Sequence, residues 1–493
     1  MKRFAARLFA LWVQKRNQKW IQNPHKAQDQ TFLKLIQKAK NTAFGQDHNF
    51  DQIVDYKSFK ERVPIRSYED IRHYVERILS GEADVLWPGQ PLYLAKTSGT
   101  TSGAKYIPIT KDSMPTHITA ARDALLNYIN ETGNTSFVTG KQIFLQGSPI
   151  LEQKNGIDYG RLSGIVAHYV PSYLQKNRMP SWDTNCIEDW ETKVDAIVDE
   201  TVQEKMTLIA GIPSWVQMYF ERLQQRENKP IGSIFPDFSL FVYGGVNYRP
   251  YRALFEKMIG KKIDSVELFP ASEGFFAYQD QQDQEGLLLL LNNDIFYEFI
   301  AADSFFDSQP KRIQLKEVEL GVNYVLILNT SAGLWGYNIG DTVQFVSKNP
   351  YRLVVSGRIK HFISAFGEHV IGKEVESALQ EALVGTQASV REFTVAPEIA
   401  PESGLPYHEW LIDFDVPPQN LPAFALALDE AMRKQNIYYD DLIQGKVLQP
   451  AVVTPVEKGA FESYMKSIGK LGGQNKVPRL ANDRTIANQL ISL

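Results

Sequence analysis

Short apolar runs alternate with helical segments between Leu92 and Phe345, and this alternation most limits the folds open to the chain. The runs stand at Gln142–Gln146, Thr207–Ala210, Ser239–Tyr243, Asp264–Phe269, Tyr324–Asn329 and Thr342–Val346. Strands that alternate with helices are typical of an α/β fold, in which crossover helices join parallel strands. We therefore predict an α/β body with a mostly parallel sheet.

The N-terminal stretch, to about Gly81, keeps its apolar residues at a 3.6-residue period and is predicted to be mostly helical. In its first helix the apolar positions at helical spacing are Phe4, Leu8, Leu11 and Trp12. Basic residues follow at once and no A-x-A-like cleavage site is present, so we expect an amphipathic helix that packs this stripe on the body. A signal peptide and a helix on a membrane surface are the alternatives.

A different pattern follows Gly357. Helical and strand-like segments stand at Lys373–Leu383, Glu392–Ala396, His408–Asp415, Leu421–Lys434 and Val447–Pro455. This set is sufficient for a small α+β domain. We therefore predict two domains, residues 1–356 and 357–493, with a linker or hinge at Ser356–Lys360.

Charge and cysteine content exclude several classes of protein. Among 493 residues, 53 are Lys or Arg and 57 are Asp or Glu, so the formal net charge of −4 gives no basic excess for nucleic acid binding. A single cysteine, Cys186, forms neither an intrachain disulfide nor a cysteine-based zinc cluster. No apolar run approaches the roughly 18–20 residues that span a bilayer. We expect a cytoplasmic globular protein without stable membrane insertion.

The clearest functional signal is a loop rich in glycine and hydroxyl side chains between two short apolar strands. It consists of Thr97, Ser98, Gly99, Thr100, Thr101, Ser102, Gly103, Ala104 and Lys105. Glycine lets backbone N–H groups approach a ligand, the hydroxyls donate to phosphate oxygens, and the lysine adds positive charge. The loop matches neither G-x-x-x-x-G-K-[ST] nor G-x-G-x-x-G, and a flexible surface turn is the alternative. We predict that it binds a polyphosphate.

Two acidic residues stand beside predicted strands. Ser272 and Glu273 follow the run Ser265–Leu268, at a strand end where α/β proteins bind ligands. A carboxylate there suits Mg²⁺ that bridges phosphates, although a glutamate can also simply favour the N-terminus of a helix. Tyr337 and Asp341 lie in a predicted turn between two strands. That aspartate can accept hydrogen bonds from two ribose hydroxyls or can hold its own backbone.

Two further segments complete the set of candidates. Lys476 lies in the polar, glycine-led loop Gly472–Arg479, where a lysine can act on a ligand or can simply be solvated. Gly244 and Gly245 end a predicted strand and let a carboxylate approach the backbone, unless they only turn the chain into a helix. Candidates to line the same pocket are His168, Arg161 and Tyr169.

In their order along the chain, these segments resemble the motifs of adenylate-forming (ANL) enzymes. Within that superfamily the chain is similar to the Gretchen Hagen 3 family of acyl acid-amido synthetases. The loop T-S-G-T-T-S-G-A-K is close to their S-S-G-T-S-x-G-x-x-K, Phe269–Glu273 is similar to Y-A-S-S-E, and Tyr337–Asp341 is similar to Y-R-x-G-D. Ser67–Ile71 and Gln474–Arg479 resemble the family's flanking segments, so the likeness spans nearly the whole chain.

The resemblance implies a fold, an activity and roles for these residues. The expected fold is a large α/β adenylating domain that binds ATP and the acyl substrate, followed by a small mobile α+β domain. The expected activity is ATP-dependent adenylation of a small carboxylic acid and transfer of its acyl group to an amine, expected to be an amino acid. In this scheme ATP contacts the 97–105 loop, Ser272, Glu273, Tyr337, Asp341 and Arg358, Mg²⁺ contacts Glu273, the acyl group lies near Gly244 and Gly245, and Lys476 stabilises charge during adenylation.

Departures from the family pattern concern substrate choice and the hinge. Phe269, Pro270, Ala271 and Asn338 differ from the family motifs, and His369 stands where plant members carry a lysine. A histidine there can donate to phosphate, with a charge that depends on pH. An acyl-CoA ligase with the same first step, and a nucleotide-binding scaffold without turnover, are the alternative functions.

Overall fold

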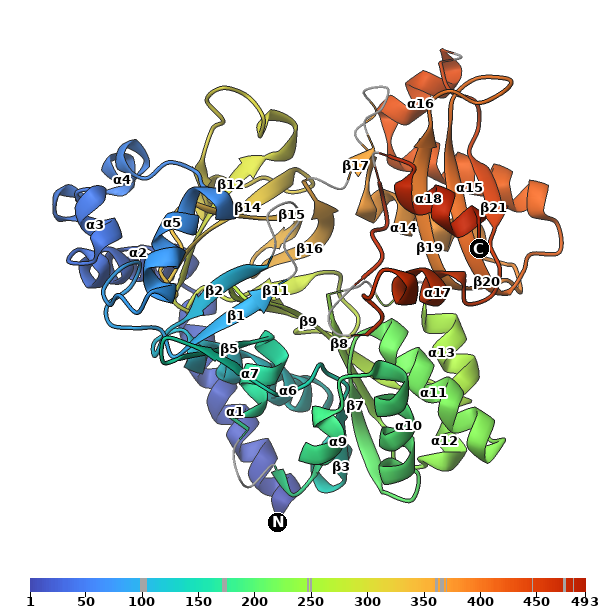
Figure 1. Ribbon diagram of the computed structural model, residues 1–493, viewed down its shortest axis with the longest axis horizontal. Coiled ribbons are helices and arrows are strands. Elements are labelled where there is room, and N and C mark those ends of the chain that lie inside the picture. The colour runs from blue at the N-terminus through green and yellow to red at the C-terminus, as the bar shows by residue number, and fades with distance from the viewer. Residues whose placement is uncertain are drawn as a thin grey trace. The chain divides into compact units, whose positions relative to one another are not determined.

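The computed structural model describes residues 1–97, 104–170, 175–245, 248, 251–359, 362–363, 368, 370–445, 447–472, 476–481 and 483–493 (Figure 1). Contacts within the chain divide it into two compact units. The first unit comprises Met1–Ile212, Ile234–Gly245 and Ile263–Val354, and the second comprises Pro213–Ser233, Val246–Lys262 and Val355–Leu493.

The N-terminal residues of the first unit form a series of helices, as the apolar period predicts. They are α1 (Lys2–Ile21), α2 (Pro24–Ala39), α3 (Ala43–Asp47), α4 (Tyr56–Arg62) and α5 (Tyr68–Leu79). Local signals favour these starts, because Thr42 and Asp55 accept hydrogen bonds from the first backbone N–H groups of α3 and α4. Ser67 and Asp70 form a capping box at α5.

The face of α1 that packs on the body is not the predicted one. The buried residues of α1 are Ala10, Val13, Asn17 and Trp20, and the helix packs against α6 (Met114–Thr132). The predicted stripe is exposed instead, by 68% at Phe4, 54% at Leu8, 49% at Leu11 and 57% at Trp12. An ion pair between Arg16 and Asp123 of α6 fixes this orientation. Neither α1 nor any other helix in the described ranges is long and apolar enough to cross a bilayer.

A large sheet holds most of the strands of the first unit. Its strand order is β13-β12-β14-β15-β16-β11-β10-β9-β8-β7-β3-β6. The bounds are β3 (Lys141–Phe144), β6 (Arg178–Met179), β7 (Met206–Ala210), β8 (Leu240–Gly244), β9 (Asp264–Ala271), β10 (Gly274–Tyr278), β11 (Leu287–Leu289), β12 (Ile295–Ala301), β13 (Ile313–Gln314), β14 (Asn323–Thr330), β15 (Tyr337–Lys348) and β16 (Tyr351–Arg358). Each apolar run that predicted a strand lies in or overlaps one of these.

Parallel pairing is confined to one half of this sheet. β6, β3, β7, β8 and β9 pair in parallel, and the chain between them includes α10 (Trp190–Thr201), α11 (Pro213–Glu227) and α13 (Arg252–Ile259). β9 to β14 pair antiparallel with their neighbours because short connections, such as Ser272–Glu273, allow only hairpins. The predicted α/β fold with a smaller C-terminal α+β part is confirmed, whereas mostly parallel pairing holds only as far as β9.

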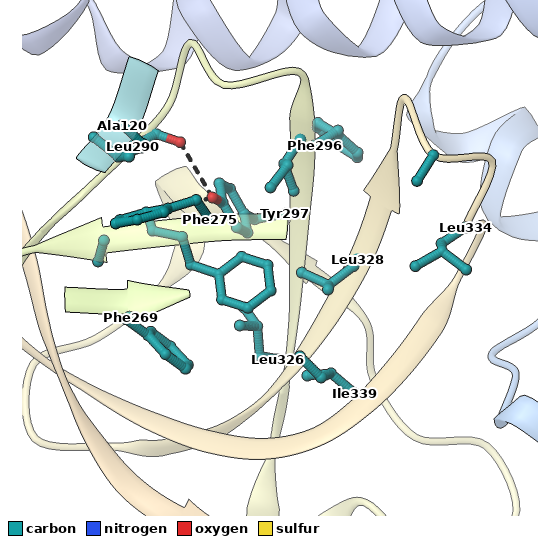
Figure 2. Close-up of a cluster of buried hydrophobic side chains, with 14 of the residues drawn as sticks. Ala120, Phe269, Phe275, Leu290, Phe296, Tyr297, Leu326, Leu328, Leu334 and Ile339 are labelled. Carbon is teal, nitrogen blue, oxygen red and sulfur yellow. Dashed lines mark hydrogen bonds between the residues drawn. The ribbon is translucent and has the colours of Figure 1, made fainter. Parts of the chain in front are cut away.

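The apolar faces of these strands enclose a hydrophobic core. Figure 2 shows Phe269 of β9, Phe275 of β10, Tyr297 of β12 and Leu326 of β14 in one cluster. None of the four is more than 7% exposed. The hydroxyl of Tyr297 donates to the carbonyl oxygen of Leu290 at 3.2 Å, so this buried polar group is satisfied. The core therefore fixes β9 and β10, the strands that carry Ser272 and Glu273 between them.

A buried charge network joins α4 to the same strands. Glu298 of β12 is 0% exposed and accepts two hydrogen bonds from Arg312, at 3.0 and 2.7 Å. The hydroxyl of Tyr56 and the amide of Asn329 each donate to the same carboxylate at 2.9 Å. A buried ion pair is tolerated only when its remaining hydrogen-bonding sites are filled, and here they are.

A second sheet of the first unit has the order β2-β1-β5-β4. Its strands are β1 (Tyr93–Thr97), β2 (Lys105–Ile109), β4 (Glu152–Lys154) and β5 (Ile157–Gly160), and α7 (Leu162–Ala167) and α9 (Trp182–Cys186) follow in the sequence. β1 and β2 form an antiparallel pair in which Thr97 lies opposite Lys105. The strands predicted on both sides of the glycine-rich loop are thus confirmed.

The C-terminal part of the second unit is a small α+β fold, as predicted. β19 (Ser389–Glu398) and β20 (Tyr407–Val416) pair antiparallel, and β20 pairs in parallel with β21 (Val452–Pro455). α14 (Gly372–Leu383) and α15 (Leu421–Gln435) match the predicted helices. Further elements are β17 (Phe362–Ile363), β18 (Val370–Ile371), α12 (Ile231–Ile234), α16 (Ile437–Gln444), α17 (Ala460–Ser467) and α18 (Thr485–Ile491).

The predicted linker is wrong at its start. Ser356, Gly357 and Arg358 are the last residues of β16 and not part of an irregular segment. Gly357 has a φ of +148°, which side chains rarely adopt, so the end of this strand depends on glycine. The division at residues 356 and 357 into a substrate-binding domain and a mobile domain stays a prediction.

Burial of His117 on α6 makes the stability of the first unit depend on pH. Burial lowers the pKa of this histidine from 6.5 to about 4. Between these values the unfolded chain binds a proton that the folded chain does not, so the free energy of unfolding falls as the pH falls. We expect this residue to account for up to about 3 kcal/mol of that loss. Denaturant unfolding of the wild type and of His117→Leu at pH 7 and pH 4 measures it, and equal losses in both proteins would contradict it.

Candidate functional site

Gly244 and Gly245 lie at the end of β8, at the carboxyl edge of the parallel strands. A Cβ atom at Gly244 would stand 2.5 Å from the carbonyl oxygen of Leu268 in β9, so a larger residue would separate the two strands. Gly245 has a φ of +77°, in the left-handed region that favours glycine. The chain therefore leaves β8 as bare backbone, at the edge where α/β sheets bind ligands.

Ser272 and Glu273 form the two-residue turn between β9 and β10, where Ala271 pairs with Gly274. Ser272 is buried and Glu273 is partly exposed. A hairpin holds this carboxylate, so the alternative of a glutamate at a helix N-terminus is wrong. Because β9 pairs in parallel with β8, Glu273 follows a strand that ends at the same sheet edge as Gly244.

The turn predicted around Asp341 is a bulge within β15. The register between β14 and β15 shifts between Val325 and Ile327, which leaves extra residues on β15. Gly340 has a φ of +89°, and its N–H donates to the side-chain oxygen of Asn338 at 2.8 Å. Bulges redirect side chains at functional sites, and the Asp341 side chain is partly exposed.

Tyr337 belongs to the hydrophobic core, with 1% of its surface exposed. Its neighbours pair with the segment before α5, because the N–H of Arg66 donates to Gly336 and the N–H of Asn338 donates to Arg66, both at 2.8 Å. These bonds fix the start of β15, three residues before the bulge. The described position of Tyr337 is structural, and its contact with ATP stays a prediction.

Thr97 and Lys105 mark the two ends of the glycine-rich loop. The predicted phosphate-binding residues Ser98, Gly99, Thr100, Thr101, Ser102 and Gly103 lie outside the described residues. Tyr68 of α5 supports the second end, since its hydroxyl accepts a hydrogen bond from the N–H of Tyr106 at 2.9 Å. The ammonium group of Lys105 lies 5.7 Å from the centre of the Tyr68 ring. The helix that precedes the loop thus fixes the strand on which the loop ends.

His168 lines a cavity of about 320 Å³ in the first unit together with Arg178, Trp182 and Asn185. Its ring nitrogen Nε2 lies 3.0 Å from the carbonyl oxygen of Pro149. Burial lowers the pKa of Arg178, whose guanidinium donates to Ala167 at the end of α7. Among the described residues that line this cavity, neither Gly244 nor Gly245 appears.

The other two side chains predicted to line the acyl pocket lie near the start and end of α7. Arg161 precedes this helix, and its side chain lies against Gly147. Tyr169 follows the helix and packs edge-on against Tyr93 of β1, with ring centres 5.8 Å apart. A common pocket of these residues with the end of β8 stays a prediction.

Lys476 belongs to the second unit and is exposed. It borders a small cavity of about 70 Å³ whose charged lining also includes Arg391, Glu392, Asp413, Glu462 and Arg479. Burial raises the pKa of Asp413 to about 6 and also raises the pKa of Glu462. The lysine thus stands beside a charged surface whose protonation changes near neutral pH.

Arg479 anchors the segment that carries Lys476, a role that the sequence analysis missed. Its guanidinium forms an ion pair with Glu392, donates to the carbonyl oxygen of Phe393 at 3.0 Å and donates to the hydroxyl of Tyr251 at 2.9 Å. The Tyr251 hydroxyl donates in turn to Glu392 at 2.8 Å. The only signal in the sequence is that this arginine closes the motif that contains the lysine.

Backbone hydrogen bonds hold the residues that follow Lys476 along β19. The N–H of Val395 donates to Arg479 and the N–H of Ala481 donates to Val395, both at 3.0 Å. The hydroxyl of Thr394 donates to the carbonyl oxygen of Pro478 at 2.7 Å. The chain is therefore fixed from Pro478 onward, two residues beyond the lysine.

The remaining predictions concern Arg358, His369 and the metal. Arg358 ends β16, in the part of that strand that belongs to the second unit, and His369 lies outside the described residues. Within the described ranges no group of three or more His, Cys, Asp or Glu side chains is arranged to hold a metal ion. Mg²⁺ that is held mainly by phosphates needs only one or two carboxylates from the protein, and Glu273 on an accessible turn fits that donor set.

Comparisons with known proteins agree along the length of the chain. The GH3 family N-terminal domain matches residues 13–186, the GH3 family central domain matches residues 288–358, and the GH3 family C-terminal domain matches residues 373–485. Similar curated proteins include a jasmonoyl–L-amino acid synthetase of Oryza sativa subsp. japonica, which is 22% identical over 93% of this chain and 92% of its own length. An indole-3-acetic acid-amido synthetase of Arabidopsis thaliana is 22% identical over 93% of this chain and 89% of its own length.

Solved structures share the fold. The acyl acid amido synthetase GH3.15 in complex with 2,4-DB superposes with a TM-score of 0.79 and 17% identity, over 97% of this chain and 95% of its own. A 2-hydroxyisobutyryl-CoA ligase in the postadenylation state superposes with a TM-score of 0.60 and 14% identity, over 97% of this chain and 93% of its own. Because three successive family models together match more than half of the sequence in the expected order, the chain belongs to the GH3 (Gretchen Hagen 3) family.

Proposed function

We propose that this protein is an ATP-dependent ligase that adenylates a small carboxylic acid and transfers the acyl group to an amine, with an amino acid as the expected acceptor. Membership of the GH3 family and the printed activities of its relatives support this proposal. The structural observation that carries it is the shared edge of β8 and β9. Bare backbone at Gly244 and the carboxylate of Glu273 follow two adjacent parallel strands there.

The reaction proceeds in two displacements. An oxygen of the substrate carboxylate attacks the α-phosphorus of ATP, the bond from this phosphorus to the bridging oxygen breaks, and pyrophosphate leaves. The amine nitrogen then attacks the acyl carbon, the bond to the AMP oxygen breaks, and the amine loses a proton. Both steps depend on positioning and on charge stabilisation, and neither requires a nucleophilic side chain of the protein.

Each candidate residue has a proposed role in the first step. Thr97, Lys105 and the loop between them contact the β- and γ-phosphates, Asp341 accepts hydrogen bonds from the ribose, and Lys476 stabilises negative charge as pyrophosphate leaves. Glu273 holds Mg²⁺, which neutralises phosphate charge when it is bound. Ser272, Tyr337 and Arg358 complete the proposed ATP contacts, and Gly244 and Gly245 face the acyl group.

The small domain is proposed to rotate between the two half-reactions, with its pivot at Gly357 and Arg358. The positive φ of Gly357 supports this position because glycine tolerates backbone conformations that other residues avoid. Arg479 would keep Lys476 in a fixed position on the rotating domain. We also propose a cytoplasmic location, with which a free Cys186 is compatible.

An acyl-CoA ligase is the closest rival, because the fold is shared with such an enzyme. The listed sequence relatives that span most of the chain are amido synthetases, and this favours an amine as the acceptor. We expect acid-dependent exchange of pyrophosphate into ATP with members of a carboxylic acid panel. We expect amide formation with amino acids and no thioester with CoA, as measured by mass spectrometry. Thioester without amide would establish the rival, and no exchange with any acid would establish a scaffold without turnover.

Replacement of Glu273 tests the magnesium site. Glu273→Ala should lower Mg²⁺-dependent exchange by at least about 100-fold, because the phosphate charge is no longer neutralised in place. Glu285→Ala, which removes an exposed carboxylate from the loop after β10, is the matched control and should keep wild-type exchange. Thermal unfolding of both variants checks the fold. Unchanged exchange in Glu273→Ala would remove this residue from the site.

Replacement of Lys476 tests its role in adenylation. Lys476→Ala should slow adenylate formation by roughly 100-fold in single-turnover assays while the affinity for ATP changes little, since the charge develops in the transition state. Lys470→Ala removes another exposed lysine of the same region and serves as the control. Equal losses of ATP affinity and rate would mean that Lys476 is only a binding contact.

A further inference from the structure

The outward face of α1 is apolar and uncovered within the described structure. Phe4, Leu8, Leu11 and Trp12 recur at intervals of three, four or one residues and are all at least 49% exposed. They lie on the side of the helix opposite Ala10, Val13 and Asn17, which pack on the body. Figure 1 shows α1 as the blue helix beside α6 that leads to the N-terminus. Four large apolar side chains on one exposed helix face are unusual for a surface that meets only water.

The charges of α1 accompany this stripe. The helix carries six basic and no acidic residues, although the whole chain has a net charge of −4. Three of the six are held against the body: Arg3 bonds to Thr139, Arg7 to the carbonyl oxygen of Gly133, and Arg16 to Asp123. The others are Lys2, Lys15 and Lys19, which are exposed.

Two of these lysines share the apolar face. Lys15 follows Leu11 by four residues and Trp12 by three, and Lys19 follows Lys15 by four, so both continue the stripe toward the C-terminus of α1. A partner that covers the stripe must therefore accept apolar side chains and ammonium groups side by side. This requirement separates the possible occupants.

A second copy of the chain fits this requirement poorly. A symmetric contact between two copies of α1 would bring two helices with six basic and no acidic residues against each other, and like charges repel at an interface. An anionic lipid surface satisfies both kinds of group. Apolar side chains enter the boundary of the acyl chains while lysine stems extend their ammonium groups to the phosphates.

We propose that α1 docks the protein reversibly on an anionic membrane surface, with the helix lying in the plane of the interface. Phe4, Leu8, Leu11 and Trp12 enter the lipid, and Lys15 and Lys19 contact its phosphates. The opposite face of α1 stays packed on α6, so the body keeps its structure. This docking does not depend on the proposed ligase activity.

The test is co-sedimentation of the full chain with vesicles of phosphatidylcholine alone or with one third phosphatidylglycerol. Wild-type protein should bind the anionic vesicles and should lose binding as the salt concentration rises. Phe4→Ser with Leu8→Ser should lower the partition coefficient by at least about ten-fold. Phe306→Ser is the matched control, because Phe306 is 68% exposed, as Phe4 is, and lies far along the chain. Lys15→Gln with Lys19→Gln should weaken binding to anionic vesicles and reduce its salt dependence.

Two readouts separate the outcomes. Pyrophosphate exchange in the absence of vesicles should be equal in the wild type and the α1 variants, which shows that the fold and the active site are intact. Wild-type protein that leaves the anionic vesicles unbound, or a serine variant that binds as the wild type does, would overturn the proposal. Sedimentation velocity covers the other occupant: a wild-type dimer that becomes a monomer in Phe4→Ser with Leu8→Ser would assign the stripe to a second copy and would also overturn it.

Discussion

Pairing of β9 with two neighbours of opposite direction is the constraint on which the candidate site depends. β9 pairs in parallel with β8 and antiparallel with β10, so the sheet changes from crossover connections to hairpins at this strand. Glycine at 244 is necessary for the first pairing because the carbonyl oxygen of Leu268 leaves no room for a Cβ atom. The second pairing closes in two residues, and Glu273 is one of them. One strand therefore sets both the bare backbone and the carboxylate.

The second unit uses a different physical device. Its essential lysine candidate is exposed, and an exposed side chain has no fixed position unless its backbone is held. The ion pair of Arg479 with Glu392, the hydrogen bonds to Tyr251 and the backbone bonds to β19 supply that restraint. Position at Lys476 thus comes from partners that are far away in the sequence.

Much of the fold could be predicted because local pattern and tertiary structure agree. The helices before Gly81, the strands on both sides of the glycine-rich loop and the small C-terminal α+β fold follow from apolar period and length. The glycines at 244 and 245 and the hairpin carboxylate Glu273 stand at strand ends, as expected. The bulge at Asp341 was read as a turn, because glycine followed by aspartate is typical of both and only strand register distinguishes them.

The sequence by itself determined the family, the order of the motifs and which segments are helix or strand, because these depend on residue types at short spacing. Tertiary structure decided which face of α1 is covered, where parallel pairing stops and which residues hold the segment after Lys476. An apolar period states that a helix has an apolar face, but burial also depends on what the neighbouring element offers. On α1 the pairing of Arg16 with Asp123 and the small Ala10 selected the opposite face.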